Sequence, residues 1–263
     1  MSPRLGERGA REERGLTSTG AARGIVTGAA RGIGKAAALR LLAEGVSVLA
    51  VDRDADGLAA LAEAGCETMV ADLADPAERD RVAERGDGID YLVNAAGIIL
   101  IKPITEVTVE EWRRVQTVNA EAIFFLCQKI GPRMKPGGAI VNLSSSSAKL
   151  ASTIEVATYA ASKTTILSIT RSFAHALAAR PVRVNAICPG IVETPMQEAV
   201  LETVGAMRGM SAAELGAARN KAVPLGRGAS PEECAGLIWF LLSKEAGYMT
   251  GQAINYTGGM VTW

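Results

Sequence analysis

A tyrosine and a lysine four residues apart are the clearest candidates for chemistry in this chain. Tyr159 and Lys163 stand in the segment Tyr-Ala-Ala-Ser-Lys, and residues at this spacing share one face of a helix. A phenol has a pKa of about 10, too high for ready proton exchange at neutral pH, and a neighbouring ammonium group lowers that pKa. The pair could therefore act as a general acid or base on a substrate oxygen. Taken alone, a coincidental amphipathic pair explains the two residues equally well.

A glycine-rich segment near the start of the chain is suited to binding a phosphate-bearing ligand. Residues Thr27–Gly34 read TGAARGIG and join an expected strand to an expected helix. Glycines let the backbone approach a pyrophosphate, and the helix N-terminus presents free N–H groups and the positive end of its dipole. By itself, the segment also fits an ordinary strand–helix turn.

An acid follows the second expected strand. Asp52 comes directly after an apolar run, and in a dinucleotide fold such an acid accepts hydrogen bonds from the ribose 2′-hydroxyl of the adenosine. A carboxylate would repel a 2′-phosphate, so the sequence favours NAD over NADP. Arg31 and Arg53 weaken this preference, since either guanidinium could meet a phosphate.

The elements that must position these residues alternate between strand and helix. Seven nearly continuous apolar runs are typical of strands covered on both faces: Gly24–Thr27, Val46–Val51, Thr68–Ala71, Tyr91–Val93, Ala139–Leu143, Arg183–Ile187 and Ala253–Tyr256. Helix starts are indicated at Asp75-Pro76, Thr108–Glu111 and Ser230–Glu233, the second helix running to about Lys129. The pattern predicts an α/β fold: a single-domain Rossmann fold, with a doubly wound parallel sheet of about seven strands and helices on both faces.

Composition excludes several other classes of protein. The 263 residues carry 28 basic and 28 acidic side chains, so no charge excess points to nucleic acid or an anionic membrane. No apolar run approaches the roughly 18 residues of a membrane span. The single histidine, His175, is expected to pack within a helix, and one histidine excludes a multi-histidine metal site. The four scattered cysteines are expected to be reduced, mostly buried thiols of a cytoplasmic protein. We expect one domain over residues 21–263, preceded by a disordered leader at residues 1–20.

Together and in order, these segments resemble the short-chain dehydrogenase/reductase family, from about Arg23 to Trp263. Thr27–Gly34 matches the family pattern TGxxxGxG, and Tyr159–Lys163 matches YxxxK. Four more stretches resemble family motifs at the adenine ring, in the NNAG and PGxxxT segments and at a helical asparagine: Asp72-Leu73, Asn94–Gly97, Pro189–Thr194 and Asn119. Two departures stand out, since Ala95 replaces the second asparagine of NNAG and Arg23-Gly24 open the first strand where apolar residues are expected.

The resemblance implies a role for each matched position. Tyr159 would be the general acid/base, Lys163 would lower its pKa and contact the nicotinamide ribose, and Asn119 would hold a water in the proton relay. No metal is implied. The cofactor-binding residues carried over are Gly28, Arg31, Gly32, Ile33, Gly34, Asp52, Asp72, Leu73, Asn94, Ala95, Gly97, Tyr159, Lys163, Pro189, Gly190, Val192 and Thr194.

The serine that would polarise the substrate carbonyl is ambiguous, because four serines run from Ser144 to Ser147. The spacing to Tyr159 that is commonest in the family selects Ser146. Alignment on the end of the strand Ala139–Leu143 selects Ser145. We favour Ser145, because strand geometry is stiffer than loop length.

The substrate side of the site should be closed by a lid from Ile191 to about Leu225. It contains Met196, Met207 and Met210, with a further helix start at Ser211–Glu214. We expect a wall more apolar than charged, with Glu155 and Glu193 as exceptions that are either exposed or bind a hydroxyl. The expected apolar wall consists of Ile98, Ile99, Leu100, Ile101, Leu150, Thr153 and Val156.

These features predict an NAD-dependent oxidoreductase that interconverts a secondary alcohol, such as a polyol or diol, and its ketone. The alternative is an NAD(P)H-dependent reductase of 3-oxoacyl or other ketones. A more remote alternative, from another class, is a dinucleotide-binding sensor without catalysis. The resemblance also implies a homotetramer built through the helices of Asn119 and Tyr159, with Ile123, Phe124, Ile166 and Ile169 as candidate apolar contacts.

Overall fold

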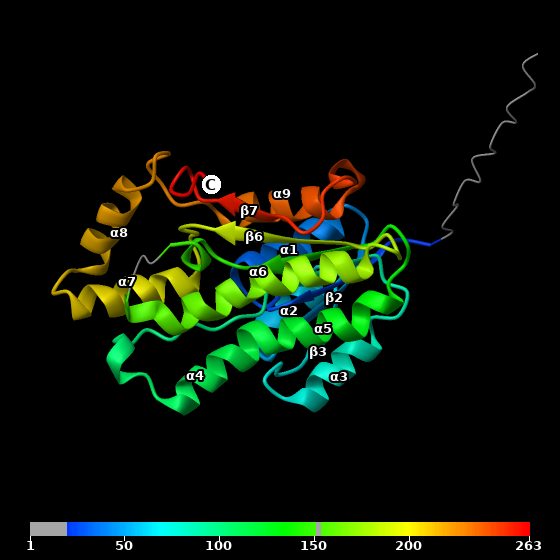
Figure 1. Cartoon of the computed structure of the whole chain (residues 1–263), viewed down its shortest axis with the longest axis horizontal. Coiled ribbons are helices and arrows are strands. Elements are labelled where there is room, and N and C mark those ends of the chain that lie inside the picture. Colours follow the sequence, from blue (N-terminus) through cyan, green and yellow to red (C-terminus); the bar gives the residue numbers. More distant parts are fainter. Residues whose placement is uncertain (1–19, 151–153) are drawn as a thin grey trace, which may run out of the picture.

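Seven parallel strands form one sheet, in the order β3-β2-β1-β4-β5-β6-β7, in the computed structural model, which describes residues 20–150 and 154–263 (Figure 1). The strands are β1 (Arg23–Thr27), β2 (Ser47–Asp52), β3 (Glu67–Val70), β4 (Tyr91–Asn94), β5 (Ala139–Leu143), β6 (Arg183–Pro189) and β7 (Ala253–Tyr256). All seven predicted strands are confirmed, with ends shifted by two residues at most. The predicted leader lies outside the described residues, apart from Gly20.

Helices cover both faces of the sheet. Their bounds are α1 (Gly32–Ala43), α2 (Ala55–Glu63), α3 (Pro76–Glu84), α4 (Val109–Gln116), α5 (Ala122–Ile130), α6 (Ala157–Leu177), α7 (Pro195–Met207), α8 (Ala212–Lys221) and α9 (Pro231–Leu242). One core cluster joins α3, α5 and α6 to one face, and a second joins α1, α2 and α9 to the other. The doubly wound fold is therefore as predicted.

Local signals in the sequence explain where the helices begin. Capping boxes close the N-termini of α4, α8 and α9, where Thr108, Ser211 and Ser230 each exchange hydrogen bonds with a glutamate three residues later. Asp75 caps α3 ahead of Pro76. The helix expected to run from Thr108 to Lys129 is interrupted, however, by a turn of π-helix at Thr117–Glu121.

The unusual start of β1 is explained by its neighbours. A Cβ on Gly24 would lie 3.2 Å from Leu41 Cδ2 and 3.4 Å from Tyr91 Cβ, so a side chain here would press on Leu41 while glycine leaves both neighbours in place. Arg23 is exposed at the strand end, and its N–H donates to Asp90 at 2.8 Å. β1 keeps its pairing to both β2 and β4, so the two residues do not break the edge of the site.

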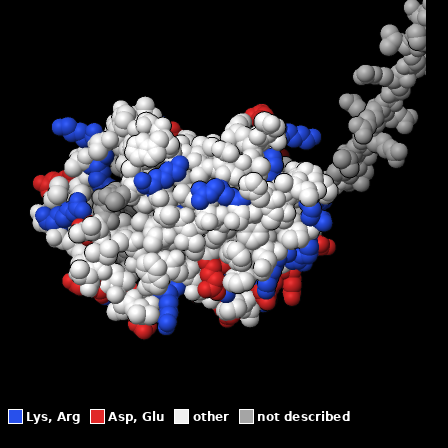
Figure 2. All heavy atoms as spheres, in the orientation of Figure 1, with Lys and Arg blue, Asp and Glu red and all other residues white. Residues whose placement is uncertain are grey.

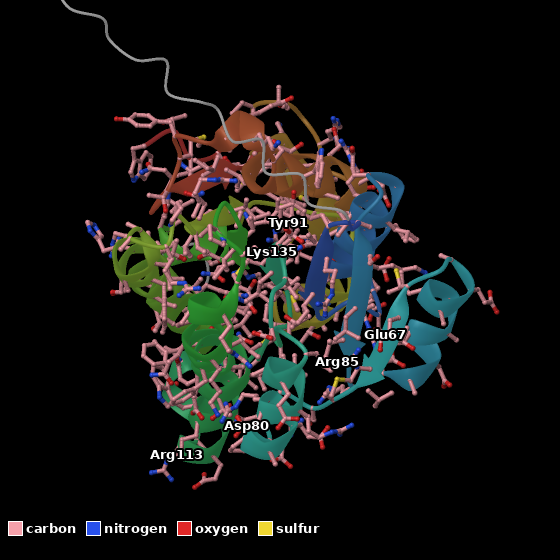
Figure 3. All side chains as sticks on the ribbon, turned by 90° about the vertical axis from the view of Figure 1, so that its right-hand side faces the viewer. Glu67, Asp80, Arg85, Tyr91, Arg113 and Lys135 are labelled. Atoms are coloured by element: carbon pink, nitrogen blue, oxygen red, sulfur yellow. The ribbon has the colours of Figure 1, made fainter. Side chains whose placement is uncertain are left out.

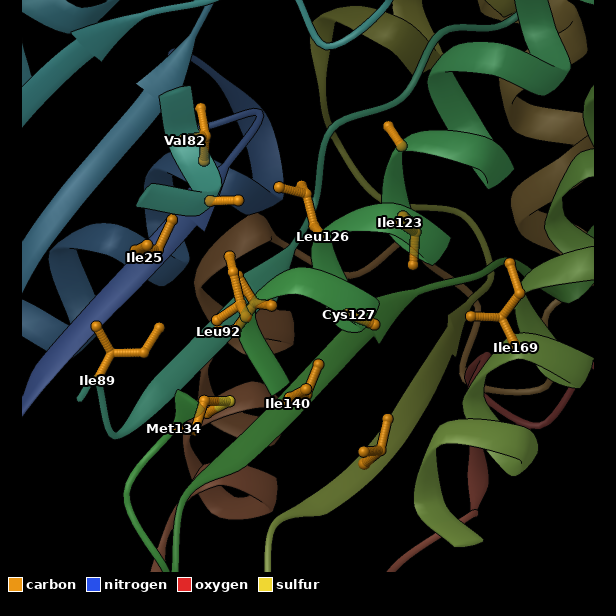
Figure 4. Close-up of a cluster of buried hydrophobic side chains, with 14 of the residues drawn as sticks. Ile25, Val82, Ile89, Leu92, Ile123, Leu126, Cys127, Met134, Ile140 and Ile169 are labelled. Atoms are coloured by element: carbon orange, nitrogen blue, oxygen red, sulfur yellow. The ribbon is translucent and has the colours of Figure 1, made fainter. Parts of the chain in front are cut away.

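Aliphatic residues fill the core, in keeping with an aromatic content of only 4%. Figure 4 shows one cluster, in which Ile25, Leu92 and Ile140 of the sheet face Leu126 and Ile169 of the helices. The four cysteines are free and buried, as expected. His175 is exposed on α6, so the expectation that it packs within the fold was wrong.

The surface carries charges of both signs without a dominant patch on the face drawn in Figure 2. Several are paired, as Arg85 is with Glu67 on β3 at 2.6 Å (Figure 3). Across the described ranges, no helix has both the length and the apolar character that crossing a bilayer requires.

Candidate active site

A cavity of about 770 Å³ opens at the carboxyl ends of the strands. This is where ligands bind in open parallel sheets, beside the point at which the strand order reverses, here between β1 and β4. The cavity runs from the turn after β1 to α7 and α8, which stand at the left of Figure 1. Most of the predicted site residues line it.

The glycine turn between β1 and α1 forms a cradle that side chains would fill. Gly28 and Gly32 have φ angles of +66° and +54°, in the left-handed region that favours glycine. A Cβ on Gly28 would lie 2.6 Å from the Ala96 backbone, and one on Gly34 would lie 2.0 Å from the Gly28 carbonyl oxygen. Because the turn is this tight, the first N–H groups of α1 can approach a pyrophosphate, so the residues present fit a dinucleotide.

Asp52 is fixed at the end of β2. Its carboxylate accepts hydrogen bonds from the N–H groups of Ala30 at 3.0 Å and Asp54 at 3.1 Å, and the side chain lines the cavity. Arg31 forms an ion pair with Asp54, so this guanidinium already has an anionic partner. Arg53 lines the cavity too and is exposed.

The loops after β3 and β4 line the part of the cavity predicted to hold the adenine ring, and they form its floor. Asp72, Leu73, Ala95 and Gly97 all line the cavity, as predicted for cofactor contacts. Thr27, the last residue of β1, holds the loop after β4 in place, because its hydroxyl accepts from the N–H groups of Ala95 and Ala96 at 3.2 and 3.3 Å.

Asn94 departs from its predicted place. Its side chain is fully buried and donates to Asn142 Oδ1 at 2.9 Å, and it does not line the cavity. The prediction of a direct cofactor contact is therefore corrected: the amide ties β4 to β5 beneath the site. The position of Asn94 inside the parallel ladder buries it.

Asn119 lies in the π-helical turn and holds the floor of the cavity. Its side-chain amide exchanges two hydrogen bonds with the backbone of Ile98, at 2.8 and 2.9 Å, and donates to Ser162 at 2.9 Å. The residue is completely buried and does not line the cavity. Both amide protons thus bond within the protein, and the side chain fixes the Ile98 backbone relative to the helix of Ser162; the predicted role in holding a water stays a prediction.

Tyr159, Lys163 and Ser145 all line the cavity. Lys163 Nζ lies 5.6 Å from the centre of the Tyr159 ring and donates to the Leu143 carbonyl at 2.8 Å. The hydroxyl of Ser145 is hydrogen-bonded to the Tyr159 phenol. Ser146 also lines the cavity, but it is Ser145 that contacts the tyrosine, and this geometry favours the alignment on the strand end.

Burial dominates the electrostatics of the pair. It raises the pKa of the Tyr159 phenol, and the hydrogen bond with Ser145 only partly opposes this. Burial also lowers the pKa of Lys163 to about 8. The expected lowering of the tyrosine pKa by the lysine is therefore not seen in the protein alone, because desolvation outweighs the hydrogen bond with Ser145, the cause that opposes it.

The loop after β6 closes the part of the cavity predicted to hold the nicotinamide. Pro189, Gly190, Val192 and Thr194 line the cavity as predicted, and Thr194 caps α7 by accepting from the Gln197 N–H at 3.3 Å. Thr194 also packs over the glycine turn, since a Cβ on Gly32 would meet its methyl group at 3.1 Å. The loop after β6 is thus in contact with the glycine turn.

The predicted lid is present as α7 and α8. Ile98, Ile99, Leu150 and Val156 line the cavity as expected, whereas Leu100 and Ile101 do not, and Thr153 lies outside the described residues. Of the two acids, Glu193 is exposed and Glu155 pairs with Arg208. The sequence did not single out Arg208 and Arg219, which line the lid end; their wide spacing carries no motif.

Comparisons with known proteins agree with this geometry. A family model described as enoyl-(acyl carrier protein) reductase matches residues 28–261. The 3-oxoacyl-(acyl-carrier-protein) reductase of Thermotoga maritima is 36% identical, covering 92% of this chain and 96% of its own. The galactitol 2-dehydrogenase of Agrobacterium fabrum is also 36% identical, covering 92% and 94%. This chain belongs to the short-chain dehydrogenase/reductase family.

A solved structure of the family has the same fold. The actinorhodin polyketide ketoreductase with NADPH superposes with a TM-score of 0.85 at 32% identity, covering 92% of this chain and 98% of its own. As a member of the same family, the protein described here is an oxidoreductase. The relatives include both a dehydrogenase and reductases by name, so the comparisons leave the substrate and the choice between NAD and NADP to other arguments.

Proposed function

We propose that the protein is an NAD-dependent oxidoreductase that interconverts a small secondary alcohol, of the polyol or diol kind, and the corresponding ketone. The observation that carries this proposal is the juxtaposition in one cavity of Tyr159, Ser145 and Lys163 with the glycine turn and Asp52. A bound nicotinamide dinucleotide would supply the hydride acceptor or donor. Gly28, Gly32, Gly34, Asp52 and the loop Pro189–Thr194 would hold it.

The residues of the chain then divide the remaining work. Tyr159 carries the proton that passes to or from the substrate oxygen. Ser145 donates a hydrogen bond to that oxygen and fixes its distance from the phenol. The Lys163 side chain lies over the tyrosine ring, and its protonated form favours the phenolate of Tyr159. Asn119 acts through Ile98 and Ser162, holding the floor on which substrate and ring must lie.

The preference for NAD is supported by the Asp52 carboxylate at the end of β2, which would repel a 2′-phosphate. Both oxygens of Asp52 are anchored by backbone N–H groups, so the acid cannot swing away from a phosphate. Arg31, which could otherwise bind that phosphate, is paired with Asp54.

The test is to compare kcat/KM for NAD and NADP on a panel of secondary alcohols. We expect at least a tenfold preference for NAD, because NAD lacks the 2′-phosphate whose charge Asp52 would repel, and one such contact is worth about this much. Asp52→Asn should narrow that preference, while Asp56→Asn removes a nearby charge on the exposed face of α2 and should leave it unchanged. A wild-type preference for NADP would reject the assignment of Asp52.

A second candidate function is favoured by two of the similar proteins. The Thermotoga protein is named as a 3-oxoacyl reductase, and the ketoreductase structure holds NADPH. If NADPH is the better cofactor and 3-oxoacyl thioesters are better substrates than small ketones, the protein is a 3-oxoacyl reductase and the first proposal is rejected. NADH binding without turnover on either class of substrate would instead indicate a sensor.

A further inference from the structure

The charged groups along the cavity are unevenly distributed. The cofactor half carries charges of both signs, including Asp52, Asp72 and Arg31. The lid half is built from α7 and α8 and is lined by apolar side chains such as Met196, Val200 and Leu215. Within the part of the chain that the structure describes, its only charged lining groups are two arginines, Arg208 and Arg219.

Arg208 already has an anionic partner. Its guanidinium donates to both oxygens of Glu155 at 3.1 Å, and the Glu155 side chain is only 13% exposed. Backbone hydrogen bonding and this arginine hold the pKa of Glu155 below its usual range, so the pair stays ionised. Arg208 therefore contributes little net charge to the cavity.

Arg219 has no such partner. It is half-buried on α8, and no carboxylate of residues 20–150 or 154–263 forms an ion pair with it. Leu215, one helical turn earlier, is buried in an apolar cluster with Val200 and Val204. An arginine remains charged in a protein, so a guanidinium in this setting loses hydration without gaining a counter-charge.

The neighbouring arginine adds to this cost. Burial lowers the pKa of Arg219, and the charge of Arg208 lowers it further, so the two guanidinium groups repel each other. An anion between the lid and the body of the protein would relieve both effects. A carboxylate or phosphate suits a guanidinium best, because its oxygens can accept two parallel N–H bonds.

We propose that Arg219 binds an anionic group of the substrate, so that the enzyme acts on a secondary alcohol that also carries a carboxylate or phosphate, such as a hydroxy acid or a polyol phosphate. Arg219 and Tyr159 line the same cavity, so one molecule can place its alcohol at the phenol and its anion under the lid. This inference rests on the proposed function and narrows its substrate class.

The test uses matched substrates that differ only in charge. The acids are 3-hydroxybutyrate, 4-hydroxypentanoate and 5-hydroxyhexanoate, in which the alcohol carbon carries a methyl group and the carboxylate lies progressively further away. They are compared with the corresponding neutral amides, with 3-hydroxybutyl phosphate and with 2,3-butanediol. We expect at least one anion to exceed its neutral counterpart tenfold or more in kcat/KM. The phosphate arm tells a phosphate site from a carboxylate site. Binding of the matching keto acids and keto amides to the NADH-loaded enzyme, measured by calorimetry, gives the same comparison without turnover.

Variants then assign the preference to the residue. Arg219→Gln should raise KM for the preferred anion at least tenfold with little change in kcat, and should leave 2,3-butanediol unaffected; Arg219→Lys should restore part of the loss. Equal binding and turnover of anionic and neutral compounds, or an Arg219→Gln loss that is the same for both, would overturn the inference while leaving the dehydrogenase intact. Absence of turnover on every alcohol and ketone, despite NADH binding, would overturn the proposed function and the inference with it.

Discussion

At the scale of single residues, the pair Tyr159 and Lys163 is shaped by burial as much as by mutual attraction. Lys163 is only 3% exposed, and its ammonium is held by the Leu143 carbonyl. Burial raises the pKa of the tyrosine and lowers that of the lysine to about 8. The lysine is therefore the group of the pair that changes charge near the physiological range.

This assignment predicts how activity depends on pH. As pH rises through about 8, the free enzyme loses the Lys163 proton, while Tyr159, with its raised pKa, stays protonated. In the direction of ketone reduction, kcat/KM should be constant from pH 6 to about 7. Above pH 8 it should fall, because neutral Lys163 no longer favours the phenolate that forms when Tyr159 gives its proton to the ketone. The fall should be about tenfold for each pH unit if one ionisation controls it. Initial rates across pH 6 to 9.5, with circular dichroism to confirm folding, measure this. A flat profile to pH 9.5 would contradict the role of Lys163.

Sequence reasoning located most residues that face the cavity, because turn glycines and a helical Tyr–Lys spacing have local signatures. It failed where a residue's role depends on distant neighbours. Asn94 sits in a motif segment, yet its side chain is buried between β4 and β5 by the register of the sheet. Arg219 has no motif at all, and its place in the cavity follows from how α8 folds back over α7.

At the scale of elements, tight turns and one helix irregularity set the geometry of the site. The π-helical turn at Thr117–Glu121 places Asn119 against Ile98 and Ser162, and the capping box that begins α4 gave no sign of it. A π turn at a functional position is common and is not encoded by helix periodicity. The glycine turn, in contrast, was predictable because its conformation demands glycine.

The packing of that turn predicts the effect of a single methyl group. Gly34→Ala would place a Cβ 2.0 Å from the Gly28 carbonyl oxygen, so the turn and α1 must move apart. We expect a loss of about 1–3 kcal/mol in the free energy of unfolding, as for other overpacked sites, and NADH affinity weakened at least tenfold. Urea denaturation and fluorescence titration measure the two effects.

Gly236→Ala is the matched control for this substitution. Gly236 lies within α9, and a Cβ there would have no heavy atom within 4 Å. This change should stabilise the protein by up to about 1 kcal/mol and leave NADH binding unaltered. Similar behaviour of the two variants would show that the turn tolerates a side chain, contrary to the geometry described above.

At the scale of the whole molecule, the fold followed from the alternation of apolar runs and capped helices. All seven strands were predictable, because strands buried on both faces are apolar throughout. Which helix face is buried was harder to predict. Ile123, Ile166 and Ile169, expected at subunit contacts, pack inward and are at most 7% exposed, so that expectation was wrong. Phe124 alone of the four is exposed, at 38%.

We still expect a homotetramer, now through Phe124 and Trp112, the exposed aromatics of α5 and α4. Exposed aromatic side chains are enriched at protein interfaces. Multi-angle light scattering should give four times the chain mass of 27.4 kDa. Phe124→Asp should shift the mass toward smaller species, whereas Leu225→Asp, a similar change at an exposed lid residue, should not. A monomeric mass for the wild-type protein would refute the expectation.

The central claim, that the Tyr159 phenol transfers the proton in a dinucleotide-dependent oxidoreductase, is tested most directly by Tyr159→Phe, with kcat and the Kd for NADH measured on the same preparation. Removal of a general acid/base typically costs 10²–10⁴-fold in rate. We predict a loss of about that size in kcat, with the Kd for NADH within about threefold of wild type, because the ring remains and only the hydroxyl is removed. Turnover within threefold of wild type would contradict the account.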